Sequence, residues 1–521
     1  MNMKRLLLYN VIIFVFVLIF YLCASSLNKI DGYLGEFVSI RNKERKIKRP
    51  NIIFILADDY GYHDIGYHGS RIKTPIMDKL AAEGVKLTNY YVQPICTPTR
   101  TQLMTGRYQI HTGFQHWVLF PYMPSCLPLD EVTVAQKLKE TGYSTHIVGK
   151  WHLGFYKKAC WPTRRGFDTF FGFLEGGQNY FTHETEGYYD FREQEEVAWQ
   201  YRGSYSTHLY ANRTQDIITK QDKNKPFFLF MSLQSVHNPL QVPDSYQEQY
   251  EHFNTDNRRL YAGMTTCMDE AIGNVTRTLK ELNLWNNTVL IFSTDNGGAP
   301  ESGGYNWPLR GRKKSLWEGG VRGIGFVHSP LLHPRVRGTE NKELIHVSDW
   351  FPTIVAGLAG GSLNGTKPLD GYNMWDTIRS GTPSPRHEIL HNIDPLEGHR
   401  RPFNDALYNN YTFIPTIRAA LRMGPWKLLT GPVGDGHWIP PPELEKTTIR
   451  STVNSNETIW LFNVKNDPYE KTDLSKERPD IVKTMLQRLL EHYSSSVPVI
   501  FPPGDTKGSP ENRGGYWTDW A

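Results

Sequence analysis

Polar side chains follow two strongly apolar runs of this 521-residue sequence, at the point where each run ends. Asp58 and Asp59 come directly after the first run, and Asp295 and Asn296 follow the second. Carboxylate and amide oxygens are the ligands that a hard cation such as Ca²⁺ or Mg²⁺ prefers. Taken alone, adjacent aspartates or an Asn-Gly-Gly sequence would be ordinary turn residues. Because both pairs end buried-strand patterns, a shared metal site is the better interpretation.

Two more apolar runs end in side chains that bind anions or transfer protons. Lys150 and His152 follow one of these runs, and His237 follows the other. A single histidine is more often a structural hydrogen-bonding group than a catalyst. The carboxyl ends of parallel strands, however, meet at one edge of an open α/β sheet, and ligands bind at that edge. Four runs that all deliver polar groups to this edge predict a reactive centre.

The segment Cys-Thr-Pro-Thr-Arg at 96–100 carries the most specific pattern in the chain. Pro98 suits the first turn of a helix and Gly106 suits its end, which places Cys96 at the helix N-terminus. Free N–H groups and the helix dipole favour an anion at that end, and Arg100 lies one turn further on. A buried structural thiol and a thiolate nucleophile of another enzyme class are the alternatives at this point.

The elements that must position these residues alternate between strand-like and helix-like patterns. The apolar, β-branched runs suit strands that are buried on both faces of a parallel sheet. Helical segments lie between them, with cap residues such as Thr74, Pro75 and Gly84 around one of them. The alternation predicts a layered α/β fold. The predicted strands are 51–57, 144–149, 226–235, 288–294 and 323–328, and the predicted helices include 74–84, 132–141 and 257–284.

The chain is long enough for one large domain and a smaller one. We expect a catalytic domain over residues 49–385 and a smaller domain over 386–521, because the sequence changes character near residue 385. Short strands at 426–429 and 459–463, followed by a helix at 481–493, favour an antiparallel arrangement in the smaller domain.

Two further segments have a character of their own. Residues 155–205 are rich in Gly, Tyr, Phe and Glu with weak periodicity, and we interpret them as long surface loops that could shape a substrate cleft. The tail over 504–521 is aromatic, and we expect it to pack on the folded domain.

The charge balance is mildly basic, with a formal net charge of +5 and a pI near 8.7. This balance is compatible with an anionic substrate such as a sulfated glycan. The sequence has no dense Lys/Arg helix of the kind that binds nucleic acid, so we expect no nucleic-acid partner.

The N-terminus carries the clearest targeting signal. Lys4 and Arg5 precede an apolar run over 6–23, which is typical of a signal peptide or signal-anchor within residues 1–25. A basic stem over 26–48 follows. We therefore expect the secretory pathway, with the lysosome, endoplasmic reticulum or extracellular space as destination and an N-terminal membrane anchor as an open possibility. Six Asn-x-Ser/Thr acceptors for glycosylation agree with this: Asn212, Asn274, Asn286, Asn364, Asn410 and Asn456.

Together these motifs resemble one family. Cys-x-Pro-x-Arg at 96–100, followed by Thr-Gly-Arg at 105–107, is similar to the sulfatase signature, and the resemblance runs from about residue 49 to residue 520. Gly-Arg-Lys at 311–313 and Trp-Glu-Gly-Gly at 317–320 are most similar to the branch that holds arylsulfatases B, I and J. The resemblance implies an alkaline-phosphatase-like α/β fold, with a large, mixed, mostly parallel sheet sandwiched by helices and a smaller C-terminal α+β domain carrying an antiparallel sheet.

The resemblance also implies a cofactor set. Asp58, Asp59, Asp295 and Asn296 would bind one Ca²⁺, together with an oxygen of the modified Cys96. In this family the cysteine is oxidised to Cα-formylglycine by the formylglycine-generating enzyme, so that enzyme is an expected partner during biosynthesis.

Roles for the cationic side chains follow in the same way. Arg100 is expected to hold the formylglycine and to offset charge beside the metal, while Lys150 and Lys313 bind sulfate oxygens. Lys314 stands next to Lys313, so the choice between them rests on spacing to the Trp-Glu motif. The disulfide Cys126–Cys160, our choice among the few cysteines, has a counterpart in the family.

The two histidines complete the implied mechanism. One hydroxyl of hydrated formylglycine attacks sulfur, and His237 faces the leaving oxygen of the substrate and protonates it with help from Lys313. The second hydroxyl then loses a proton to His152, sulfate is eliminated and the aldehyde is regenerated.

Three functions remain open on the sequence. The first is an active sulfatase on aryl sulfates and on sulfated glycosaminoglycan sugars of the N-acetylgalactosamine 4-sulfate type. The second is a metal-dependent phosphodiesterase or phosphatase of the same superfamily, which usually presents Thr or Ser as nucleophile and often two metals. The third is a catalytically idle glycan-binding relative, which the presence of every expected ligand and lysine disfavours.

Overall fold

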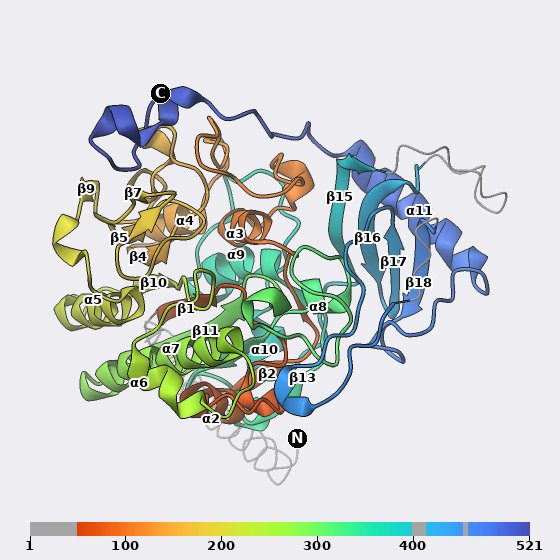
Figure 1. Cartoon of the computed structure of the whole chain (residues 1–521), viewed down its shortest axis with the longest axis horizontal. Helices are drawn as coiled ribbons and strands as arrows, with labels where there is room; N and C mark the ends of the chain where they lie inside the picture. Colours follow the sequence, from red (N-terminus) through yellow and green to blue (C-terminus); the bar gives the residue numbers. More distant parts are fainter. Residues whose placement is uncertain (1–48, 399–412, 452–456) are drawn as a thin grey trace, which may run out of the picture. The chain divides into compact units, whose positions relative to one another are not determined.

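The computed structural model describes residues 49–398, 413–451 and 457–521, and the chain from Pro50 to Ala521 forms one compact unit (Figure 1). The predicted signal segment over 1–25 and the basic stem over 26–48 lie outside the described residues, as do the acceptors Asn410 and Asn456. Within the described ranges, no helix is both long and apolar enough to cross a membrane.

A ten-stranded sheet forms the centre of this unit, with the strand order β13-β2-β12-β11-β1-β10-β4-β5-β8-β9. Its middle consists of parallel neighbours, with β1 between β11 and β10, and β4 beyond β10. These four strands confirm four of the predicted runs. The fifth, β12, pairs antiparallel with β11, so the sheet is mixed. The bounds are β1 Asn51–Ala57, β4 Ser144–Lys150, β10 Phe227–Ser232, β11 Thr288–Thr294 and β12 Gly325–His328.

Successive residues of β1 enter two different cores, one on each face of the sheet. Phe54 belongs to the core that also holds side chains of α3, α4 and the helical segment around Trp350. Its neighbour Ile55 belongs to the core formed with α2, α5 and α7. The period-two pattern of a fully apolar strand therefore buries both faces, as predicted for a layered α/β fold. The bounds are α2 Pro75–Glu83, α3 Cys96–Thr105, α4 Val134–Glu140, α5 Ser206–Lys220 and α7 Asp256–Glu281.

The helix α3 has the start and end that its sequence predicts. It begins at Cys96, and Gly106 ends it with φ of 70°, donating its N–H to the carbonyl of Gln102 at 2.8 Å. All ten residues of α3 are buried, although the helix contains few apolar side chains. Buried polar side chains need partners, and Arg100 of this helix finds two of them in Asp58 and Asp295.

The prediction of loops over 155–205 was wrong in one respect, because β5 crosses this segment as a strand of the central sheet. β5 pairs in parallel with β4, and four of its five residues are buried. A Cβ on Gly172 would lie 2.0 Å from the carbonyl oxygen of Gly149, so the two backbones approach each other at glycines. The glycine that permits this approach weakens the strand pattern in the sequence. The bounds are β5 Thr169–Phe173, β6 Glu184–Thr185, β7 Tyr188–Tyr189, β8 Arg192–Glu193 and β9 Glu196–Val197.

A separate four-stranded antiparallel sheet follows in the C-terminal part, with the order β15-β16-β17-β18. The helix α11 packs against it through Leu486 and Leu489, which share a core with Leu428. The predicted strands at 426–429 and 459–463 and the predicted helix agree with β17, β18 and α11 to within a few residues. The bounds are β15 Glu388–Gly398, β16 Ile417–Met423, β17 Trp426–Thr430, β18 Ile459–Asn463 and α11 Pro479–Ser494.

The aromatic tail packs on the domain as expected. Trp517 is completely buried, and its ring lies 4.9 Å from that of Tyr122 and 6.3 Å from that of Phe155. The remaining α-helices and strands are short: β2 Val85–Leu87, β3 Tyr90–Tyr91, α6 Asp244–Gln247, α8 Glu318–Val321, β13 Thr339–Asn341, β14 Ile345–His346, α9 Trp350–Pro352 and α10 Trp375–Ser380.

Candidate active site

Three elements bring acidic groups and the candidate nucleophile together. Asp58 and Asp59 follow β1, Asp295 follows β11, and Cys96 begins α3. All four side chains are buried, and their potential ligand atoms lie within 4.8 Å of one another. The two strands are hydrogen-bonded neighbours, so their carboxyl ends necessarily deliver both acidic pairs to one edge of the sheet.

The backbone at this edge is held in uncommon conformations. Asp59 has φ of 55°, in the left-handed region that non-glycine residues rarely occupy, and its N–H donates to Oδ1 of Asp295 at 3.2 Å. A Cβ on Gly297 would lie 1.8 Å from the carbonyl oxygen of Gly319, so only glycine fits after Asn296. Strain of this kind persists where the surrounding structure fixes it, and it is frequent at functional sites.

Asn296 carries a buried acceptor without a protein partner. Its amide nitrogen donates to Oδ1 of Asp59 at 2.8 Å and to the carbonyl of Gly297 at 3.0 Å. Its Oδ1 is buried and has no hydrogen-bond partner among the described residues. An unpaired buried oxygen costs free energy unless a cation or donor satisfies it. Beside three carboxylates, this oxygen fits a hard, oxygen-liganded cation such as Ca²⁺.

Positive side chains surround the carboxylates. Arg100 donates to Asp58 at 3.2 Å and to Asp295 at 3.0 Å, and Lys150 forms a buried ion pair with Asp58. The ammonium group of Lys313 lies 2.6 Å from Oδ1 of Asp59. The three cations offset part of the acidic charge, so the ligand set tolerates burial while keeping oxygens available to a metal.

Burial and neighbouring charges shift the pKa values of the acidic groups in this cluster in opposite directions. Burial alone would raise the pKa of Asp58, but the charges of Lys150, His237 and Arg100 hold it well below its ordinary value. For Asp295, burial and the neighbouring charge of Asp58 raise the pKa to about 7. Burial, followed by the charge of Asp58, also raises the pKa of the Cys96 thiol. An unmodified Cys96 would therefore be a poor nucleophile, because thiolate is the reactive form.

His152 is held so that one ring nitrogen can accept a proton. Its Nε2 lies 3.0 Å from the carbonyl oxygen of Leu119, which can only accept, so Nε2 carries the hydrogen. Its Nδ1 is buried and has no partner among the described side chains and backbone. Burial, and then the charges of Lys150 and Arg100, lower the pKa of His152 well below its ordinary value. The ring is therefore neutral, and Nδ1 is the nitrogen that is left to accept a hydrogen bond or a proton.

His237 occupies the more open side of the site. Its Nδ1 lies 2.7 Å from the carbonyl oxygen of Asn238, and its Nε2 lies 3.7 Å from Oδ2 of Asp59. The side chain is 22% exposed, whereas Asp58 and Lys150 have no exposed side-chain surface. Nε2 is therefore the ring atom that a substrate can reach.

The structure places the two adjacent lysines in different surroundings. Lys313 points to Asp59 in the buried cluster, whereas Lys314 is exposed and its ammonium group lies 5.5 Å from the ring centre of Trp117. Lys314 has φ of 75°, which turns the two neighbouring side chains to different sides. All the residues assigned to the nucleophile, the metal and the sulfate oxygens are thus brought together, with Lys313 rather than Lys314 among them.

Sequence reasoning missed two hydroxyl groups that support the site. The hydroxyl of Ser232 accepts from Arg100 at 2.7 Å and donates to the carbonyl of Lys150 at 2.7 Å. Thr99 donates to the backbone carbonyl of Asp295. Thr99 lies inside the Cys-x-Pro-x-Arg segment, which is the one signal that could have found it. Ser232 ends an otherwise apolar strand, and its polarity there is a weaker signal.

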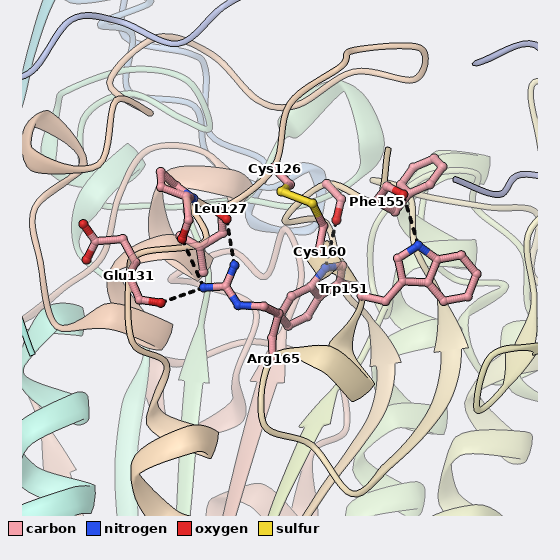
Figure 2. The surroundings of a disulfide bond; sticks show 10 residues. Cys126, Leu127, Glu131, Trp151, Phe155, Cys160 and Arg165 are labelled. Atoms are coloured by element: carbon pink, nitrogen blue, oxygen red, sulfur yellow. Dashed lines mark hydrogen bonds between the residues drawn. A yellow bond between two sulfur atoms is a disulfide. The ribbon is translucent and has the colours of Figure 1, made fainter. Parts of the chain in front are cut away.

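A disulfide lies close behind the site. Cys126 and Cys160 are bonded, and the loop they close stabilises the fold by about 4 kcal/mol on the chain-entropy model for its separation of 34 residues. A Cβ on Gly154 would lie 2.6 Å from Cβ of Cys126, so the bridge packs on the segment that follows His152. Figure 2 shows Arg165 beside it, donating to the carbonyl of Leu127 at 2.7 Å.

The predicted glycosylation acceptors within the described residues differ in exposure. Asn212, Asn286 and Asn364 are exposed. Asn274 is half-buried inside α7 and accepts a hydrogen bond from Arg277, so it is the least accessible of the four.

The sheet, its polar edge and the site residues define the alkaline-phosphatase-like fold, which the solved structures similar to this chain share. The family model described as Sulfatase matches residues 50–361. This chain belongs to the sulfatase family, and its relatives support hydrolysis of sulfate esters.

Three similarities place the chain within the family. It is 52% identical to mouse arylsulfatase J over 485 residues, which covers 91% of this chain and 80% of that protein. It is 31% identical to human N-acetylgalactosamine-6-sulfatase, covering 67% and 69% of the two chains. The solved structure of Ps i-CgsB bound to k-i-k-neocarrahexaose has a TM-score of 0.73 and 29% identity, covering 88% of this chain and 95% of that one.

Proposed function

We propose that this protein is a Ca²⁺-dependent sulfatase that uses Cα-formylglycine at position 96 to hydrolyse sulfate esters. One observation carries the proposal: three buried carboxylates, the unpartnered Oδ1 of Asn296 and the N-terminus of α3 converge on Cys96. Asp58, Asp59, Asp295 and Asn296 would hold the ion. When bound, Ca²⁺ supplies positive charge that offsets the charge of the reacting sulfate and favours ionisation of an adjacent hydroxyl.

The modification at Cys96 explains why this position holds a thiol that is unreactive as such. Formylglycine supplies, as its hydrate, two hydroxyl groups on one carbon, one to attack sulfur and one to release sulfate afterwards. The buried neutral His152 takes a proton at Nδ1, since Nε2 is committed to the carbonyl of Leu119. Arg100 fixes the two aspartates that follow β1 and β11.

The remaining residues act on the substrate. Lys150 and Lys313 neutralise the sulfate oxygens as the S–O bond breaks, an effect that is strong in a buried site. His237, on the more exposed side, faces the leaving oxygen through Nε2. The two lysines pair with Asp58 and Asp59, and their ammonium groups can also reach an anionic ligand beside these carboxylates.

For the substrate we propose sulfated glycosaminoglycan sugars of the N-acetylgalactosamine 4-sulfate type, together with simple aryl sulfates. The similarity to arylsulfatase J and to an N-acetylgalactosamine sulfatase supports this class without fixing the position of the sulfate. We further propose maturation in the secretory pathway, where the formylglycine-generating enzyme acts, with the lysosome, endoplasmic reticulum or extracellular space as destination.

Mass spectrometry of the peptide that spans Cys96, taken from protein secreted by cells with active formylglycine-generating enzyme, tests the proposal. We expect an aldehyde at residue 96 and hydrolysis of an aryl sulfate that disappears in Cys96→Ala while the thermal unfolding curve is retained. Unmodified thiol in every preparation, or turnover by Cys96→Ala, contradicts the proposal. A phosphate diester and a phosphate monoester in the same assay test the phosphohydrolase alternative.

A further inference from the structure

Two adjacent glycines, Gly176 and Gly177, lie against the two histidines of the active site, and none of the roles assigned above belongs to them. A Cβ on Gly176 would lie 2.8 Å from Nε2 and 2.9 Å from Cε1 of His152. A Cβ on Gly177 would lie 3.0 Å from both Cε1 and Nδ1 of His237. Neither glycine has a φ in the left-handed region, so the constraint at these positions is space and not backbone conformation. Glycine here lets the backbone approach both rings closely.

Each glycine of this pair lies near the ring nitrogen that the proposed reaction does not use. Gly176 is closest to Nε2 of His152, the nitrogen that donates to the carbonyl of Leu119, while Nδ1 takes the proton. Gly177 is close to Nδ1 of His237, the nitrogen that donates to the carbonyl of Asn238, while Nε2 faces the leaving oxygen. In both rings the reactive nitrogen is therefore the one more distant from the glycine.

The glycine pair is fixed by hydrogen bonds on both sides. Asp190, a side chain that is 1% exposed, accepts from the N–H of Leu174 at 3.1 Å and from the N–H of Glu175 at 2.9 Å. On the other side, the hydroxyl of Thr185 donates to the carbonyl of Gly177 at 2.7 Å. A buried carboxylate that accepts from two backbone N–H groups holds a segment more firmly than neutral contacts do. The backbone that follows β5 is thus held at a set distance from the two rings.

The same segment also holds the backbone of His152. The N–H of His152 donates to the carbonyl of Leu174 at 3.1 Å, and His152 has φ of 54°, in the left-handed region. An uncommon backbone conformation of this kind persists where neighbouring contacts determine it. The main chain of His152 and its ring are therefore held by residues that are only two positions apart, Leu174 and Gly176.

From these contacts we infer that Gly176 and Gly177 are positioning residues of the sulfatase reaction, the first for the ring of His152 and the second for the ring of His237. The inference rests on the proposed function, in which His237 gives a proton to the leaving oxygen and His152 takes one from the hydroxyl that releases sulfate. Because the two histidines act in different steps, a side chain at each glycine should slow a different step. A merely structural role would not separate the two steps.

Gly177→Ala should slow the first step, in which the S–O bond to the leaving group breaks. Its Cβ displaces the ring of His237, so the leaving oxygen departs without its proton. We expect kcat/KM to fall about 10- to 100-fold for N-acetylgalactosamine 4-sulfate, whose alkoxide is a poor leaving group, but less than about twofold for nitrophenyl sulfate. Thr185→Val removes the hydroxyl that holds Gly177 and adds no atom near a ring, so the same pattern should appear with a loss of about threefold.

Gly176→Ala should slow the later step, in which sulfate is released. Its Cβ displaces the ring of His152, and we expect kcat for nitrophenyl sulfate to fall about tenfold or more. Since release is then the slow step for every substrate, kcat should reach one common value for both substrates, while each kcat/KM changes less than about twofold. Rapid mixing should give a burst of nitrophenol, and mass spectrometry should find sulfate on the peptide that spans residue 96.

Controls separate these effects from the mere addition of a methyl group. Gly504→Ala, whose Cβ would meet its nearest neighbour at 3.4 Å, should keep the kinetic constants of the wild type. Crystal structures of Gly176→Ala and Gly177→Ala show, without any turnover, whether the facing ring has moved. Rings that stay in place, or equal losses for both substrates in Gly177→Ala, overturn the inference. If the alanine variants do not fold, equal losses for both substrates in Thr185→Val overturn it.

The proposed function and the role of the glycines fail in different ways. If the proposed function is wrong, wild-type protein hydrolyses neither substrate and carries no aldehyde at residue 96, while the crystal structures still decide whether the glycines set the rings. If only the role of the glycines is wrong, wild-type protein hydrolyses both substrates, and the losses in Gly177→Ala do not depend on the leaving group.

Discussion

Substitution of Lys427 by methionine should destabilise the protein strongly, although this residue is outside the reactive centre. Its ammonium group lies 2.9 Å from Glu318 and 2.9 Å from Glu470, and all three side chains have no exposed surface. Lys427 comes from β17, while Glu318 begins α8 in the segment that also carries Lys313. The triad therefore joins the C-terminal sheet to a segment of the active site.

The two carboxylates depend on Lys427 to different degrees. Glu318 also accepts a hydrogen bond from Tyr91 at 2.7 Å and lies 3.6 Å from Arg322. Glu470 has Lys427 as its one ion-pair partner among the described residues, besides the backbone N–H of Glu318 at 2.7 Å. Even beside Lys427, burial raises the pKa of Glu470 to about 7. Removing the ammonium group thus leaves Glu470 as an uncompensated buried acid.

The size of the destabilisation in Lys427→Met follows from the burial of the charge that is left without its partner. Breaking a buried ion pair by removing one partner costs about 3–5 kcal/mol. An unfolding entropy of about 2.1 cal/mol/K per residue over roughly 470 residues gives about 1 kcal/mol/K. We therefore expect Lys427→Met to lower Tm by about 3–5 °C at pH 7, measured by calorimetry. Because Gly319 packs against Gly297, a shift of this segment should also lower kcat.

The loss of stability in Lys427→Met should depend on pH with a definite sign. A carboxyl whose pKa is raised in the folded state binds a proton that the unfolded chain releases, so its contribution to stability is lost as pH rises. The difference in stability between wild type and Lys427→Met should therefore be small near pH 5 and grow towards pH 8. The double variant Lys427→Met/Glu470→Gln serves as the control, since the amide still accepts from the N–H of Glu318 and carries no charge. A Tm change below about 1 °C, or no recovery in the double variant, refutes the reasoning.

Two further predictions concern the metal and the backbone that supports it. Removal of metal with a chelator should abolish aryl sulfate hydrolysis and lower Tm, and Ca²⁺ at about 100 times its Kd should restore about 2.7 kcal/mol of stability. Unchanged activity in excess chelator, with no metal detected in the protein, contradicts the ligand assignment. Gly297→Ala should eliminate Ca²⁺-dependent stabilisation, because its Cβ would meet the carbonyl oxygen of Gly319 at 1.8 Å, whereas Gly504→Ala, with its nearest neighbour at 3.4 Å, should not. Equal thermal shifts with Ca²⁺ in wild type and Gly297→Ala count against this account.

The central sheet could be predicted from the sequence because its strands are buried on both faces. A run such as Asn51–Ala57 predicts a central strand, and the end of this strand fixes the position of Asp58. The same logic located α3, since Gly106 ends it in the left-handed conformation that glycine adopts at low cost. β5 was missed because its aromatic and glycine-rich sequence lacks a strand-like period, and its pairing with β4 is a tertiary contact.

The buried charges that support the site from the C-terminal sheet could not be predicted, because their contacts join residues far apart in the chain. Lys427 and Glu318 are 109 positions apart, and Arg418 reaches the carbonyl of Lys314 across 104. In the sequence each is an ordinary charged residue, and only the folded chain shows which charges are buried together. The ligands at strand ends depend on the sheet alone, whereas the position of Lys313 depends on how the C-terminal sheet holds its segment. Changes in that sheet should therefore alter the position of Lys313, and with it the sulfate contact proposed for this lysine, without touching a proposed metal ligand.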